Sequence, residues 1–163
     1  MQGQSMTPKE AAAALVGALP TGLSDANLEE YGIQPAAGRA QGITRELLAL
    51  NLFWISAAVK AHIPQKYQAV VSELVLSNIE RGWGTTYPVG DMSWTAFLNH
   101  WTERNRKYQR LVDDGASPLA VSTEAAALME EQRLIEEDDH RNLLTLLIDS
   151  VPVDAYDQLL KGL

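Results

Sequence analysis

Apolar residues recur along most of this chain at intervals of three and four positions, which is the spacing of one face of an α-helix. The clearest stripe runs from Trp94 to about Val112 and consists of Trp94, Phe97, Leu98, Trp101, Tyr108 and Leu111. No stretch shows strong alternation of apolar and polar residues between hairpin turns, the pattern of a half-buried strand. The sequence therefore predicts an all-α fold, a single-domain irregular bundle of about seven helices.

The longest apolar run, residues 47–59, is interrupted only by Asn51 and Ser56. It is shorter than the roughly eighteen residues that a helix needs to cross a bilayer, so we expect no membrane contact. Because the run is apolar on every side of a helix, it predicts a central helix over residues 43–62 that other helices surround. Asn51 and Ser56 then need polar partners inside the core.

Local signals predict where the first helices begin and end. The sequence Thr7-Pro8-Lys9-Glu10 has the spacing of a capping box with proline at the first helical position, so a helix should run from Pro8 to about Leu19. Ser24 predicts the start of a short second helix that ends at Gly32. The composition of residues 34–42 indicates a linker before the central helix.

The overall composition is that of one globular domain. The chain has 163 residues, of which 46% are apolar and 21% charged. We expect residues 1–6 to be a tail or a remnant of expression, and residues 7–163 to form the single helical domain. The absence of cysteine excludes disulfides, thiolate chemistry and Cys-ligated metal sites. This absence, with no secretory pattern at the start, favours a cytoplasmic location.

Charge is distributed unevenly along the chain. Residues 113–163 carry twelve acidic side chains against three basic ones, whereas residues 1–112 carry nine against ten. A segregated charge of this kind bears on the choice of partner rather than on the fold. It draws attention to the densest acidic run, residues 136–139, and to His140 beside it.

The acidic run admits a weak metal-site alternative. Glu137 and His140 have the Glu-x-x-His spacing that helical di-iron proteins use, but such sites need a second copy, and the sequence has none. We therefore expect no metal and no other cofactor. His140 shares a helical face with Leu143 and Leu147, which indicates a partly packed histidine near a carboxylate.

Two arrangements of residues 118–149 remain open. The acidic run is either a junction between two helices, with Asp138 or Asp139 capping the second, or part of one long helix. In the long helix, Glu130, Arg133, Glu137 and Arg141 would form a ladder at spacings of three and four. The carboxylates are expected to be exposed in both arrangements.

A basic cluster lies near the end of the Trp94 helix and consists of Arg104, Arg106, Lys107 and Arg110. The net charge of −8 would oppose a polyanion, so we expect no nucleic-acid binding. Two roles are open for the cluster: its cations complement a helix C-terminus, or they dock on the acidic run within the fold.

Two groups of aromatic residues also have alternative roles. Trp83 and Tyr87, in the glycine- and proline-rich residues 81–90, form either an adjustable contact surface or a loop that packs over the core. Trp94, Trp101 and Tyr108 either pack within the chain or form an exposed patch that drives homo-oligomerisation.

These observations predict a soluble, non-enzymatic interaction or regulatory domain, of an inhibitor-like or adaptor-like kind. Its acidic C-terminal surface would bind a basic protein partner. The expected contact residues are Glu130, Glu131, Glu136, Glu137, Asp138, Asp139, Trp83 and Tyr87. The alternative is a small-molecule-binding domain or enzyme, with an aromatic pocket between the central helix and the Trp94 helix and with a carboxylate or His140 in acid–base chemistry. No hydrolase elbow, phosphate loop or zinc-helix motif is present, so no catalytic residue is assigned.

Overall fold

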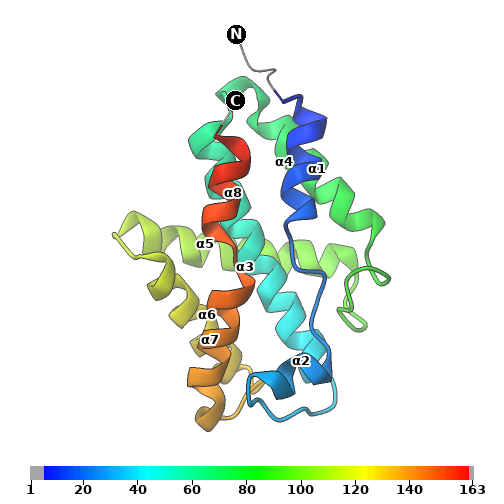
Figure 1. The fold of residues 1–163 in the computed structure, drawn as a ribbon, viewed down its shortest axis with the longest axis vertical. Coiled ribbons are helices and arrows are strands. Elements are labelled where there is room, and N and C mark those ends of the chain that lie inside the picture. The colour runs from blue at the N-terminus through cyan, green and yellow to red at the C-terminus, as the bar shows by residue number, and fades with distance from the viewer. Residues whose placement is uncertain (1–5, 162–163) are drawn as a thin grey trace.

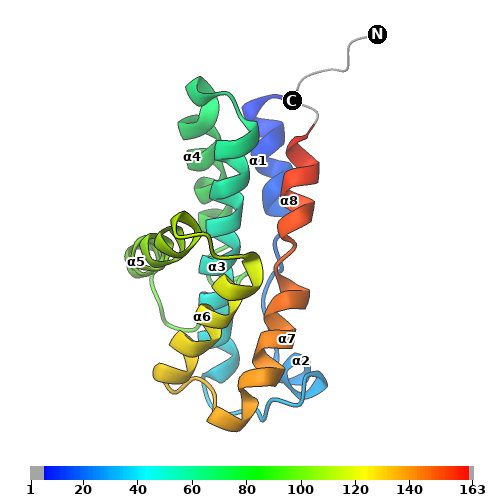
Figure 2. The ribbon, with the colours of Figure 1, turned by 90° about the vertical axis from the view of Figure 1, so that its left-hand side faces the viewer.

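A computed structural model describes residues 6–161 of the chain (Figures 1 and 2). Its elements are α1 (Pro8–Gly17), α2 (Asp25–Glu30), α3 (Arg39–His62), α4 (Gln65–Arg81), α5 (Trp94–Asp113), α6 (Pro118–Glu131), the 3₁₀ turn η1 (Glu137–Asp139), α7 (His140–Ser150) and α8 (Val153–Leu160). Over these residues the only bridge of β type is an isolated one between Trp83 and Tyr87. The predicted all-α class is confirmed.

Helix α3 is the central helix, as predicted. It contacts α4, α5, α6 and α8, and in Figures 1 and 2 it runs through the middle of the molecule with α5 crossing it. By length and composition α3 is the one described helix that could cross a membrane, but 78% of its most apolar window is buried inside the protein. An apolar helix that is mostly covered in this way is typical of a protein core.

The start of α3 differs from the prediction, because the helix begins at Arg39 rather than at residue 43. Gly38 precedes it in a left-handed conformation (φ 73°) and gives no side-chain cap, so the usual signal for a helix start is missing. Gly42 lies in the first turns of this helix. A Cβ there would stand 2.5 Å from a methyl carbon of Leu134, so the close packing requires glycine. A glycine required for close packing therefore looked like part of a linker.

The predicted polar partners of Asn51 exist. Its amide group donates to the carbonyl oxygen of Leu47 at 2.9 Å and to that of Ser150 at 3.3 Å. Its side-chain oxygen accepts a hydrogen bond from the Tyr156 hydroxyl at 2.6 Å. Because each of these groups is satisfied, Asn51 ties α3 to the connection between α7 and α8 without an unpaired polar atom.

The predicted capping box at the start of α1 is present. The Thr7 hydroxyl accepts from the backbone N–H of Glu10 at 3.1 Å, and the Glu10 carboxylate accepts from the N–H of Thr7 at 3.2 Å. Residues 1–5 of the predicted tail lie outside the described residues. Met6, the last residue of that tail, is half-buried and packs against the core.

The C-terminal third contains two helices rather than one. Helix α6 ends at Glu131, Arg133 has a left-handed backbone (φ 61°), and α7 begins only at His140. The ladder that includes Glu130 and Arg133 is therefore not built on one helix. Ile135, in the intervening turn, is 3% exposed, and its burial stabilises the turn more than a few exposed ion pairs would stabilise a long helix. Asp139 stands at the N-cap position of α7 without making a capping hydrogen bond.

Candidate functional site

The predicted acidic surface is centred on the turn between α6 and α7. Glu131, Glu136, Glu137 and Asp138 are exposed, while Glu130 and Asp139 are half-buried. These side chains project from a helix end, an irregular turn and a 3₁₀ turn instead of from one helical face. The break between the two helices thus spreads the carboxylates around one end of the molecule.

Helix α2 brings further carboxylates to the same end. The Tyr31 hydroxyl donates to Asp149 at 2.7 Å, and the Asn142 amide donates to the carbonyl oxygen of Gly32 at 3.4 Å, so that α2 is held against α7. Glu29 and Glu30 on α2 are exposed. Figures 1 and 2 show α2 beside the α6–α7 turn.

We call this region the acidic end and define it by Glu29, Glu30, Glu130, Glu131, Glu136, Glu137, Asp138 and Asp139. Sequence reasoning missed Glu29 and Glu30 because about a hundred residues separate them from the rest, and only the packing of α2 on α7 joins them.

Few cations balance the acidic end. Arg39 approaches Glu136 at 3.6 Å, and its side chain is 10% exposed while that of Glu136 is 77% exposed. Arg133 and Arg141 are exposed on the neighbouring segments. Three cations among eight carboxylates leave this end strongly negative, and its most exposed groups interact mainly with water.

His140 contacts a carboxylate, as its sequence context indicated, but not the one in its own motif. Its Nδ1 lies 3.1 Å from Oε2 of Glu130. Glu137 therefore does not share a metal-binding arrangement with it. Across residues 6–161, no group of three or more histidine, cysteine or acidic side chains is placed to hold a metal ion.

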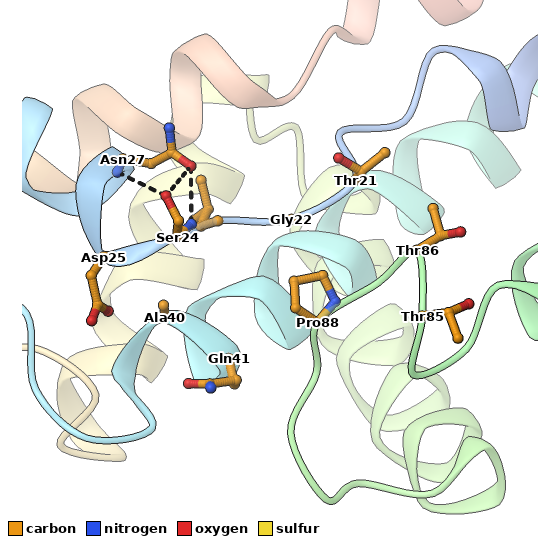
Figure 3. A pocket seen from close by; sticks show the side chains of 11 residues that line it. Thr21, Gly22, Ser24, Asp25, Asn27, Ala40, Gln41, Thr85, Thr86 and Pro88 are labelled. Atoms are coloured by element: carbon orange, nitrogen blue, oxygen red, sulfur yellow. Dashed lines mark hydrogen bonds between the residues drawn. The ribbon is translucent and has the colours of Figure 1, made fainter.

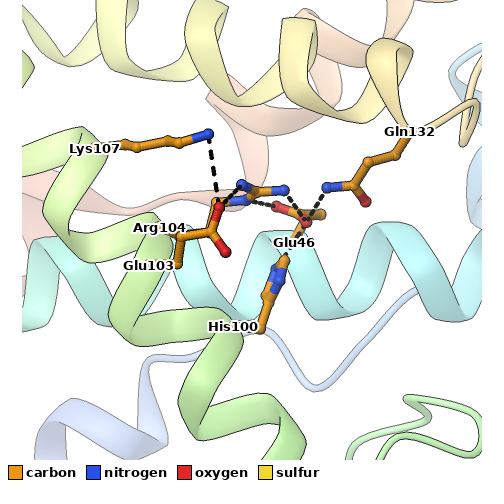
Figure 4. Close-up of polar contacts among 6 residues, drawn as sticks. All are labelled: Glu46, His100, Glu103, Arg104, Lys107 and Gln132. Atoms are coloured by element: carbon orange, nitrogen blue, oxygen red, sulfur yellow. Dashed lines mark hydrogen bonds and ion pairs between the residues drawn. The ribbon is translucent and has the colours of Figure 1, made fainter.

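The basic cluster on α5 is divided between the interior and the surface. Arg104 is 4% exposed. Its Nε donates to Oε2 of Glu46 at 3.1 Å and its Nη2 to Oε1 at 3.3 Å (Figure 4). Lys107 pairs with Glu103 on its own helix at 3.7 Å. Within the part of the chain that the structure describes, no ion pair joins this cluster to residues 136–139, so the docking alternative is not what the fold contains.

Glu46 is the centre of a polar network that the sequence did not reveal. It is 1% exposed. Nε2 of His100 lies 2.8 Å from its Oε1, and the Gln132 amide donates to the same oxygen at 3.3 Å (Figure 4). The sequence did contain one signal of this network. Glu46 is the single acidic residue in the predicted core helix, and a buried charge requires a partner.

The electrostatics of this network favour the ionised carboxylate. Burial by itself would raise the pKa of Glu46, but hydrogen bonds from His100 and Arg104 and the charges of those groups hold it below its ordinary value. Glu46 therefore ties α3 to α5 and, through Gln132, to the C-terminal end of α6. It supports the base of the turn that carries the acidic end.

The loop with Trp83 and Tyr87 packs over the core. The Trp83 indole donates to the carbonyl oxygen of Met92 at 2.9 Å, and its ring centroid lies 4.9 Å from that of Phe97. Tyr87 is 4% exposed. Tyr87 is therefore closed to a partner, Trp83 is half-buried, and the exposed carboxylates form the most accessible part of the predicted surface.

The aromatic stripe of α5 also packs within the chain. Tyr108 is fully buried, with its ring centroid 5.6 Å from that of Phe53, and Trp94 and Trp101 are half-buried against the core. They do not form the exposed patch on which the homo-oligomer alternative depended. Helix α3 supplies the partner surface that the sequence could not identify.

The structure has little free space where the alternative function placed a pocket. The cavity between α3, α4 and α5, beside Trp101, measures about 50 Å³. Pockets for small molecules measure roughly 300–1,000 Å³. A hollow of about 480 Å³ lies elsewhere, where the α1–α2 loop meets the loop before Pro88 (Figure 3). Its lining includes Thr21, Ser24, Thr85 and Thr86, and contains no aromatic residue.

Comparisons with known proteins add no assignment: no family model matches the sequence, and neither the curated proteins nor the solved structures contain a significant match.

Proposed function

We propose that this protein is a non-enzymatic helical interaction domain whose acidic end binds a basic protein partner, in the manner of a small inhibitor or adaptor. The observation that carries the proposal is the exposure of Glu131, Glu136, Glu137 and Asp138 at one end of the fold. The basic side chains of α5 do not pair with these carboxylates: Arg104 pairs with Glu46, and Lys107 pairs with Glu103. A cytoplasmic location is part of the proposal and is favoured by the cysteine-free composition.

The arrangement suits recognition by charge. Carboxylates presented together attract a cationic surface over a distance of about one Debye length and orient it before contact. The turn that carries them is anchored by the buried Ile135 and by the hydrogen bond from Gln132 to Glu46. A fixed carboxylate array costs less conformational entropy on binding than a mobile acidic tail would.

The test is affinity capture from the lysate of the source organism, with the wild type and a variant that carries Glu136→Lys, Glu137→Lys, Asp138→Lys and Asp139→Lys. We expect a basic protein to be retained by the wild type at low salt, to be released at high salt, and to be lost with the variant. The purified partner should then bind the purified wild type directly.

A control variant separates local from global charge. Glu73→Lys, Glu80→Lys, Asp91→Lys and Asp114→Lys change the net charge equally at exposed positions outside the acidic end. We expect this control to retain the partner. Loss of the partner with both variants, or retention by both, would contradict a docking role for the acidic end, and circular dichroism of each variant checks that it is folded.

A further inference from the structure

An apolar groove lies between the start of α1 and the start of α4, at the opposite end of the molecule from the acidic end (Figure 1). It encloses about 390 Å³, within the range of roughly 300–1,000 Å³ that small-molecule pockets occupy. Ala11, Ile63 and Val71 form its buried floor, with exposed fractions of 6% or less. Met6 and Tyr67 stand at its rim.

Two large apolar side chains of α4 are exposed at or near the groove, although only Tyr67 lines it. Tyr67 is 42% exposed and Val70, one turn further along α4, is 45% exposed. These are two of the four large hydrophobic side chains that remain exposed over the described residues. Exposed apolar area next to a hollow typically marks a binding surface, because its burial by a ligand is favourable.

The backbone and hydroxyl of Thr7 at the mouth of the groove belong to the capping box of α1. The hydroxyl of Thr7, which lines the groove, accepts from the N–H of Glu10 at 3.1 Å, and the Glu10 carboxylate in turn accepts from the N–H of Thr7. The floor of Ala11, Ile63 and Val71 carries no polar side chain and offers contacts to a hydrocarbon chain.

Charged side chains of both signs stand near the mouth, where the Glu10 carboxylate is held by the N–H of Thr7 and Lys66 lies over Tyr67. The Nζ atom of Lys66 lies 5.0 Å from the centroid of the Tyr67 ring. Lys9 in the first turn of α1 and Lys60 in the last turn of α3 are exposed at the same end of the molecule. A ligand that places its apolar part on the floor would thus bring an anionic group beside Lys66.

We propose that this groove binds the anion of a medium-chain carboxylic acid, with the alkyl chain against Ala11, Ile63 and Val71 and the carboxylate beside Lys66. The proposal goes beyond the protein-binding function and does not depend on it. Charge complementarity at the rim favours an anionic amphiphile over a neutral alkyl compound, and the enclosed volume favours a single short chain.

Octanoate is the probe, added below its critical micelle concentration to the full chain and followed by calorimetry and by ¹H–¹⁵N correlation spectra. We expect saturable binding, with shifted amides confined to α1 and to the adjoining ends of α3 and α4. Octan-1-ol and octyltrimethylammonium, which share the chain but not the charge, should bind at least about threefold more weakly.

Two variants test the assigned contacts. Lys66→Gln should weaken octanoate binding about threefold, since it removes one exposed charge. Tyr67→Ala should weaken it about tenfold, since it removes one apolar wall. The matched controls Lys107→Gln and Leu119→Ala alter an exposed lysine and an exposed leucine on α5 and α6, and should leave the affinity unchanged.

Three results would overturn the proposal. Equal binding of octanol and octanoate would show that charge at the rim has no role. Amide shifts spread over the whole protein would show adventitious binding. Sedimentation as a dimer without ligand, abolished by Tyr67→Ala, would show that a second copy of the chain covers the groove.

Discussion

Glu46 shows how a single residue can organise the interface between two helices. Its carboxylate is 1% exposed, and a charge in that position is tolerated only because Arg104 and His100 approach it directly. Each partner in such a pair depends on the other. Removal of Glu46 leaves Arg104 buried with only the exposed Glu103 beside it, whereas removal of both Glu46 and Arg104 leaves no buried ion of this pair to be compensated.

We predict that Glu46→Leu lowers the free energy of unfolding by about 3 kcal/mol, because Arg104 then stays buried with only the exposed Glu103 carboxylate, 3.6 Å away, as a counter-charge. The double variant Glu46→Leu with Arg104→Met should recover most of this loss. Urea unfolding monitored by circular dichroism at pH 7 measures both. A cost below about 1 kcal/mol for the single variant would mean that Arg104 escapes to solvent.

Because of Glu46, we also expect the free energy of unfolding to depend on pH. The pKa of Glu46 is lower in the folded protein than its ordinary value, so its ionised form stabilises the fold. That contribution is fully present above the unfolded pKa of about 4.3 and is lost as the pH falls through the lower folded pKa. The difference in unfolding free energy between the wild type and Glu46→Gln should thus shrink as the pH falls below about 4. A difference that grows as the pH falls below about 4 would contradict this assignment.

At the scale of elements, the end of α6 decides the shape of the acidic end. The backbone N–H of Leu134 donates to the carbonyl oxygen of Met129 at 2.9 Å, and the N–H of Arg133 to that of Glu130 at 2.9 Å. This hydrogen-bond pair is the Schellman motif, which normally places glycine at the left-handed position. Here Arg133 occupies that position (φ 61°), which costs a residue with a Cβ about 1 kcal/mol.

We predict that Arg133→Gly raises the free energy of unfolding by about 1 kcal/mol, because glycine adopts the left-handed conformation without strain. Arg133→Ala is the matched control, since it removes the same charge and the same exposed side chain but retains the Cβ. Thermal unfolding of the two variants should separate them by a few degrees. Equal stability would show that the turn relaxes to another conformation.

At the scale of the whole molecule, the two ends carry opposite character. The acidic end combines α2 with the α6–α7 turn, and the end opposite bears exposed lysines around an apolar groove (Figure 1). The proposed protein partner and the proposed carboxylate would therefore bind about the length of α3 apart. Charge at the acidic end should act mainly on the rate of association, because exposed carboxylates attract a partner before contact but add little to the final complex.

We predict that the association rate constant with the captured partner falls at least about tenfold between 20 and 500 mM salt, whereas the dissociation rate constant changes less. The four-lysine variant at residues 136–139 should associate slowly at every salt concentration. Surface plasmon resonance measures both constants. A salt effect confined to dissociation would place the charges inside the interface instead of in the encounter.

The sequence by itself determined the helical class, the central apolar helix, the capping box at Thr7 and the exposure of the acidic run. Each of these follows from spacing along the chain or from the cost of burying a charge, which act between neighbouring residues or on single side chains. Two helix ends were not predicted. The start of α3 at Arg39 has no side-chain cap, and the end of α6 at Glu131 is not followed by a glycine.

Only the tertiary structure decided which distant residues meet. Glu46 and Arg104 pair across 58 positions, and α2 reaches the acidic end through Asn142, 110 positions from Gly32. The same packing turned Tyr87 and Tyr108 inward, although their sequence context allowed exposure. The physical reason is that periodicity gives the direction of an apolar face but not the surface that covers it, which depends on how all the helices share one core.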